Sequence, residues 1–177
     1  MAKKNVFLHL GPSLPGVPES HAALRDSALL APVGLAVPKV DQVVMDHADI
    51  EIRRRHKELG LRRRDVEGAW AEVCRRAFKK ARKGRDVVIS QPGFVDADYQ
   101  QVALALDGLV GLRLHLVLTP PTDHLDPRSL AGHWAKFVKK EGRLHVLPLG
   151  PDATGDDLAA GIVRLTGIPV TTPVRAA

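Results

Sequence analysis

Short apolar runs rich in valine and leucine alternate along the chain with segments whose apolar residues recur every three or four positions. Nearly continuous short apolar runs are typical of strands that are buried on both faces of a sheet. These runs predict five strands, at Asn5–Leu10, residues 33–37, Asp86–Ser90, Arg113–Leu118 and residues 143–147.

The segments between these runs have the spacing of amphipathic helices. We expect Asp65 to cap the helix that contains Trp70, and Gly84 to follow its end. Asp96 or Asp98 opens the next helix, and Gly167 and Pro169 end the last one. The predicted stripes are Trp70, Val73, Cys74, Ala77, Phe78 and Ala81; Tyr99, Val102, Ala103, Leu106, Leu109 and Val110; Leu130, Trp134, Phe137 and Val138; Leu158, Ala159, Ile162 and Val163; and a weaker one of Val44, Ala48 and Ile52.

Strands that alternate with helices need crossover connections, which produce parallel sheets. The pattern therefore predicts a three-layer α/β/α sandwich with a mostly parallel sheet of about five strands. The 177 residues, 45% of them apolar, suit one domain. We place that domain at residues 1–170 and expect a loose tail at residues 171–177.

Composition narrows the class of protein. No apolar run approaches the roughly 18 residues of a membrane span, and the apolar stretch after Lys4 is too short for a secretory signal. A single cysteine, Cys74, cannot form an intrachain disulfide, so we expect a reducing, cytoplasmic location. Aromatic residues make up only 4% of the chain, which argues against a stacking platform for single-stranded nucleic acid.

The net charge of +6 is concentrated in residues 53–85, which hold 14 Lys and Arg against four acidic residues. Such a stripe can bind an anionic partner, or it can be the solvated face of helices. We favour the solvated face over nucleic-acid binding, because no base-reading motif accompanies the stripe. The candidate anion-binding patch is Arg53, Arg54, Arg55, Arg62, Arg63, Arg64, Arg75, Arg76, Lys79, Lys80 and Lys83.

The turn after the first strand, residues 11–18, keeps the two-glycine spacing of a phosphate-binding loop. Its chemistry differs, because Val17 and Pro18 stand where lysine and a hydroxyl residue belong. Three prolines each remove a backbone N–H donor, and Glu19 repels a bound phosphate. The turn therefore reads as a rigid strand-to-helix connection rather than a working phosphate site.

The order of these segments resembles the sulfotransferase family of P-loop folds, in particular its divergent bacterial members. That family opens with a strand ending in LHIG and a loop for the phosphosulfate end of the donor, and this chain has Leu8-His9-Leu10-Gly11. Weaker similarities follow at His47, Gly68-Ala69-Trp70, Val87-Val88-Ile89-Ser90, Val117-Leu118-Thr119, Trp134 and residues 143–167.

By motif position, the resemblance implies that Gly11, Ser13, Gly16, Ser90, Thr119 and Arg128 face the donor, 3′-phosphoadenosine 5′-phosphosulfate. Three places depart from the family. Its loop lysine aligns with Leu14, its His-Glu pair is replaced by Gln91-Pro92, and Pro120-Pro121 replaces the arginine for the 3′-phosphate. The resemblance thus implies a member that kept the fold while its donor site degenerated.

No other constellation specifies a chemistry, so no catalytic residue and no metal ligand is assigned. His9 and His115 fall within strand patterns, which indicates satisfied core residues rather than bases. His47 lies near Asp46 and Asp49, but this spacing matches no strong metal motif. The cluster of Thr119, Asp123, His124, Asp126 and Arg128 is explained about as well by loop composition.

Three hypotheses remain. The first is a non-catalytic sulfotransferase-like domain that binds a ligand or a protein partner, which we favour. The second is an active sulfotransferase that moves a sulfuryl group to an acceptor hydroxyl, at a site between residues 11–18, Ser90 and residues 119–128. The third is a module that holds an anionic polymer through residues 53–85.

Overall fold

The computed structural model describes residues 3–11, 20–120, 132–138, 140, 142–150 and 152–167. It contains a five-stranded, all-parallel sheet with the strand order β2-β3-β1-β4-β5. The central strand β1 (Asn5–Leu10) lies between β3 (Asp86–Ser90) and β4 (Arg113–Leu118), and β2 (Leu35–Ala36) and β5 (Leu144–Val146) form the edges. The predicted α/β fold with a parallel sheet is therefore confirmed.

The three inner strands have the predicted bounds, whereas both edge strands are shorter than predicted. Val33 and Gly34 belong to a turn, in which Gly34 has a φ of +80°. At the other edge, Val146 is 44% exposed and ends β5. An edge strand is paired on one side only, so an apolar pattern alone does not fix where its pairing stops.

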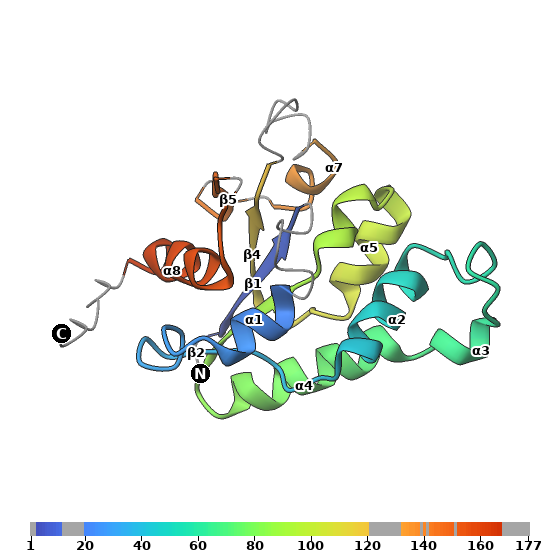
Figure 1. Ribbon diagram of the computed structural model, residues 1–177, viewed down its shortest axis with the longest axis horizontal. Helices are drawn as coiled ribbons and strands as arrows, with labels where there is room; N and C mark the ends of the chain where they lie inside the picture. The colour runs from blue at the N-terminus through green and yellow to red at the C-terminus, as the bar shows by residue number, and fades with distance from the viewer. Residues whose placement is uncertain are drawn as a thin grey trace.

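Helices cover both faces of the sheet (Figure 1). α1 (Ser20–Asp26) and α8 (Gly155–Leu165) pack against the face that carries Phe7 and Val117. The opposite face, which carries Leu8, is covered by α2 (Gln42–Ile52), α4 (Ala69–Arg82), α5 (Tyr99–Asp107) and α7 (Gly132–Ala135). Two short elements, α3 (Arg63–Val66) and η1 (Pro92–Asp96), lie in the connections. None of the helices described is both long and apolar enough to cross a membrane.

Three of the predicted helix-end residues are confirmed and one is wrong. Gly167 follows α8 with a φ of +72°. Gly84 follows α4 with a φ of +81°, and the Asp98 side chain accepts the Gln101 N–H at the start of α5. Asp65 does not cap α4, since it lies in α3 and accepts the backbone N–H of Arg62. The start of α4 is capped by the Glu51 carboxylate of α2, which accepts the N–H groups of Gly68 and Trp70 at 2.8 Å each. A cap supplied from another helix leaves no local sequence signal.

Most of the predicted stripes form the core. The predicted stripe on α4 is buried except at Phe78, which is half-buried. In the weak stripe on α2, Ala48 and Ile52 are buried, whereas Val44 is half-buried and Met45 is buried beside it. The predicted stripe of α5 is only partly correct, since Tyr99 is 55% exposed and Ala103 is exposed as well. Val110 is 72% exposed because α5 ends at Asp107. Leu130, Pro169 and the predicted tail at residues 171–177 lie outside the described residues.

Candidate functional site

The carboxyl ends of the three inner strands meet at His9. His9 is opposite Ser90 of β3 in the sheet register, and Thr119 follows directly on β4. Its Nδ1 atom lies 2.8 Å from the Ser90 hydroxyl, and its Nε2 atom lies 3.0 Å from the Thr119 hydroxyl. One imidazole therefore bridges the ends of the two strands on either side of its own.

Ser20, the first residue of helix α1, adds a further hydroxyl group to this network. The Ser20 hydroxyl lies 2.6 Å from that of Ser90, and the Thr119 hydroxyl donates to the Leu10 carbonyl. These partners favour one direction for the chain of hydrogen bonds: Ser20 donates to Ser90, Ser90 to Nδ1 of His9, and Nε2–H of His9 to Thr119. We call Ser20, Ser90, His9 and Thr119 the hydroxyl–imidazole chain.

The hydroxyl–imidazole chain is closed to solvent. His9 is 0% exposed, and Ser90 and Thr119 are 1% exposed. Burial lowers the pKa of His9 from 6.5 to about 4, so the imidazole is neutral at neutral pH. A neutral imidazole with both nitrogens engaged is a structural bridge, which confirms the prediction that His9 is a satisfied core residue.

A second buried histidine borders the same network. His21 of α1 is 3% exposed, and its Nε2 atom lies 3.2 Å from the Pro38 carbonyl oxygen. The backbone N–H of Ser90 approaches Nδ1 of His21 at 3.5 Å. Burial lowers the pKa of His21 to about 4 as well. Both imidazoles are therefore neutral at neutral pH and contact the network as uncharged groups.

Gly11 is required by packing at this point. Its φ is +152°, and a Cβ atom on it would overlap the side chain and carbonyl of Thr119. Of the residues predicted to face a donor, the structure therefore brings Gly11, Ser90 and Thr119 together. Ser13, Gly16 and Arg128 lie outside the described residues, as do Asp123, His124 and Asp126.

A hollow of about 310 Å³ opens beside Ser20 and Ser90, between α1, α2 and η1. We call it the carboxyl-end hollow. Its described lining contains two carboxylates, Asp46 and Asp49, and neither lysine nor arginine. The residues that line it are Ser20, His21, Gln42, Met45, Asp46, Asp49, Ile50, Ser90, Gln91, Pro92 and Gly93.

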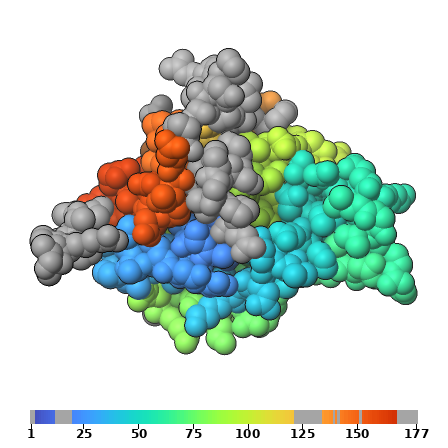
Figure 2. Space-filling view, viewed as in Figure 1, coloured from blue at the N-terminus to red at the C-terminus, as the bar shows by residue number. Residues whose placement is uncertain are grey.

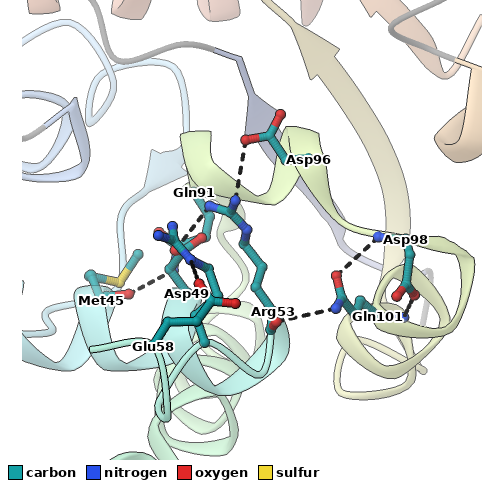
Figure 3. A network of polar contacts seen from close by, with 9 residues as sticks. Met45, Asp49, Arg53, Glu58, Gln91, Asp96, Asp98 and Gln101 are labelled. Atoms are coloured by element: carbon teal, nitrogen blue, oxygen red, sulfur yellow. Dashed lines mark hydrogen bonds and ion pairs between the residues drawn. The ribbon is translucent and has the colours of Figure 1, made fainter. Parts of the chain in front are cut away.

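Polar contacts fix the wall that α2 and η1 supply (Figure 3). The Gln91 amide donates to the Met45 carbonyl at 2.7 Å, and the Arg53 guanidinium lies 3.3 Å from carboxylate oxygens of both Asp49 and Asp96. Burial raises the pKa of Asp49, although Arg53 opposes this. Arg53, an arginine of the predicted patch that contacts this wall, is thus held between two carboxylates.

The sequence did not single out Ser20, His21 or Gln42 for this site. Ser20 and His21 open a helix at the carboxyl end of β1, which is a positional signal that could have been used. Gln42, Asp46 and Asp49 share one side of α2 by their spacing, but the sequence does not say that this side borders the end of β3.

The other candidate side chains lie elsewhere. Cys74 is buried in the core, where burial raises the pKa of its thiol to about 12. His115 is half-buried, and its Nδ1 atom lies 3.1 Å from Nε2 of His145 on β5. In the part of the chain that the structure describes, no three His, Cys, Asp or Glu side chains are grouped as they would be to hold a metal ion.

The predicted anion-binding patch divides into two parts. Its arginines are largely paired with acidic side chains: Arg53 with Asp49 and Asp96, Arg55 with Glu58, Arg62 with Asp65, Arg63 with Glu67, and Arg75 and Arg76 with Glu72. Arg54 and Arg64 are exposed. Lys79, Lys80 and Lys83, at the end of α4, have no carboxylate within 4.0 Å among the described residues. The patch lysines without an acidic partner therefore gather at the end of α4.

Comparison with known proteins adds no identification. No family model matches the chain, and neither a curated protein nor a solved structure matches it at a significant level.

Proposed function

We propose that this chain is a sulfotransferase-like α/β domain with a degenerate donor site, which binds a ligand or a protein partner and does not transfer a sulfuryl group. The resemblance of segments such as Leu8-His9-Leu10-Gly11 suggests the family. The parallel sheet is compatible with it, because Gly11 follows the central strand, where ligands bind in open α/β sheets.

The observation that carries the proposal is the charge of the carboxyl-end hollow. A phosphosulfate donor brings several negative charges, which need cations or free backbone N–H groups. Instead, the described lining presents Asp46 and Asp49, and Arg53 beyond it is engaged by two carboxylates. Carboxylates that line the hollow repel an anion bound inside it.

The state of the hydroxyl–imidazole chain supports the same proposal. The resemblance implies that Ser90 and Thr119 contact the donor, yet their hydroxyl groups are engaged by His9. Each residue is only 1% exposed, so little surface remains for a substrate oxygen. His9 itself is a weak base, because burial lowers its pKa to about 4.

Thermal unfolding with 3′-phosphoadenosine 5′-phosphate tests this proposal, because a ligand that binds only the folded state raises the melting temperature. The protein to use is Lys80→Gln/Lys83→Gln, which removes two cations of the α4 end that could attract the nucleotide elsewhere. We expect no shift at millimolar nucleotide. A clear, saturable shift in this variant would overturn the proposal and favour the active sulfotransferase, with donor-to-hydroxyl transfer near Ser90 and residues 119–128.

The third hypothesis, an anionic polymer held by residues 53–85, has one observation in its favour: the unpaired lysines at the end of α4. It predicts heparin or DNA binding that weakens steeply with salt. The pairing of arginines such as Arg62 and Arg75 with neighbouring acids argues against a continuous binding stripe.

A further inference from the structure

The unpaired lysines border two adjoining hollows beside the edge strand β2. Lys39, Lys80 and Lys83 line both of them. The larger hollow, of about 400 Å³, also has an apolar lining of Leu24, Leu30, Ala31, Leu35, Ala36 and Val37. The smaller one, of about 230 Å³, is lined by Arg76 and Lys79 in addition. We call the larger one the lysine hollow.

Segments distant in the sequence build this region. In Figure 2, residues 20–36 (blue) lie directly above α4 (green) at the lower edge of the molecule. Arg85 fastens the wall of the hollow, because its guanidinium donates to the carbonyl oxygens of Ala31 at 2.7 Å, Leu35 at 2.9 Å and Gly34 at 3.2 Å. The wall is therefore held in place before any ligand arrives.

The cations here repel one another. Partial burial lowers the pKa of Lys80, and Lys39, Lys83, Arg85 and Lys79 lower it further. The negative end of the α4 dipole accounts for cations in the last turn of that helix. It does not account for Lys39, which comes from the segment between β2 and α2. An anion bound between these cations would offset their repulsion.

We propose that the lysine hollow binds a small amphipathic organic anion, with its apolar body against Ala31, Ala36 and Val37 and its acidic head between Lys39, Lys80 and Lys83. The volume falls in the usual range of small-molecule sites, about 300–1,000 Å³. Its lining combines six apolar residues with five cationic ones and Ser27, which suits a ligand that has both an apolar body and an acidic group. The apolar wall distinguishes this site from a surface that holds a polymer by charge alone.

The proposal is independent of the donor site, so either can fail alone. A fluorescence titration with 1-anilinonaphthalene-8-sulfonate tests it, because this probe joins an aromatic body to one sulfonate. We expect saturable binding to the wild type, with one dominant site. N-phenyl-1-naphthylamine, which has the same body without the sulfonate, should bind at least about tenfold more weakly, since the head group then finds no partner.

Variants locate the site. Lys80→Gln/Lys83→Gln should weaken binding of the sulfonate probe at least about tenfold, whereas Lys57→Gln/Lys140→Gln, with the same loss of charge elsewhere, should change it less than about twofold. Urea unfolding of both variants should match the wild type, which excludes loss of fold. Equal weakening in both variants, or none in either, would overturn the proposal. Absent probe binding together with salt-sensitive heparin binding would overturn it in favour of the polymer.

Discussion

The carboxyl-end hollow and the lysine hollow lie in the same small domain but differ in charge and in how their polar groups are used. In the first, hydroxyl and imidazole groups bond to one another, and Asp46 and Asp49 supply negative charge. In the second, Lys39, Lys80 and Lys83 face an apolar wall with no described carboxylate in ion-pair distance. At the carboxyl ends of the strands, where such folds usually bind ligands, the polar side chains of this domain are part of the core. The unpaired lysines lie beside β2 instead.

The two regions should differ most in how they affect the free energy of unfolding at acidic pH. The pKa of His9 and of His21 is lowered to about 4 in the folded state, against 6.5 when unfolded. As the pH falls below 6.5 the unfolded state takes up protons first, so stability is present above that value and is lost toward pH 4. Each histidine should lower the free energy of unfolding by about 3 kcal/mol between pH 7 and pH 4. Urea unfolding across this range measures the loss.

The same pH series in His9→Gln assigns the effect. This variant keeps polar atoms in reach of Ser90 and Thr119 but does not titrate, so its stability should depend less on pH by about 3 kcal/mol. Lys80→Gln should leave the pH dependence between 4 and 7 as it is in the wild type. An unchanged pH dependence in His9→Gln would show that His9 does not carry the effect.

The next largest effect is expected from removing the bridge itself. His9→Ala leaves the Ser90 and Thr119 hydroxyls without their partner and opens a cavity at the centre of the sheet. We expect a loss of about 3–4 kcal/mol in the free energy of unfolding. His56→Ala, outside the core, should cost less than about 0.5 kcal/mol. A cost below about 1 kcal/mol for His9→Ala would contradict the structural role of the hydroxyl–imidazole chain.

A smaller effect is expected at Gly11. Gly11→Ala places a methyl group against Thr119 at a positive φ, and we expect a loss of about 2 kcal/mol by urea unfolding. Gly150→Ala is the matched control, because nothing lies within 4 Å of the Cβ position there. Equal costs for the two substitutions would mean that the Gly11–Thr119 packing does not constrain this strand end.

The sequence predicts most of the fold because burial imposes periodicity. The inner strands such as Asp86–Ser90 and the buried stripe of α4 follow directly from apolar spacing. Long-range polar contacts leave no such pattern. The capping of α4 by Glu51 joins residues 17 and 19 positions apart, and it replaced the local cap expected at Asp65.

The candidate site divides in the same way. That Gly11, Ser90 and Thr119 lie together follows from parallel strands whose carboxyl ends share one edge of the sheet. Two other features depend on how side chains from distant elements are placed. His9 engages both hydroxyl groups, and Lys39 lies beside the lysines of α4. The sequence placed the excess charge in residues 53–85 but did not show that most of its arginines are paired.

The melting temperature of Lys80→Gln/Lys83→Gln with about 1 mM 3′-phosphoadenosine 5′-phosphate tests most directly whether a donor site survives. A surviving donor site that is saturated a hundredfold would add about 2.7 kcal/mol of stability. An unshifted melting temperature is the result we predict, and a rise of several degrees that saturates with nucleotide would contradict the account.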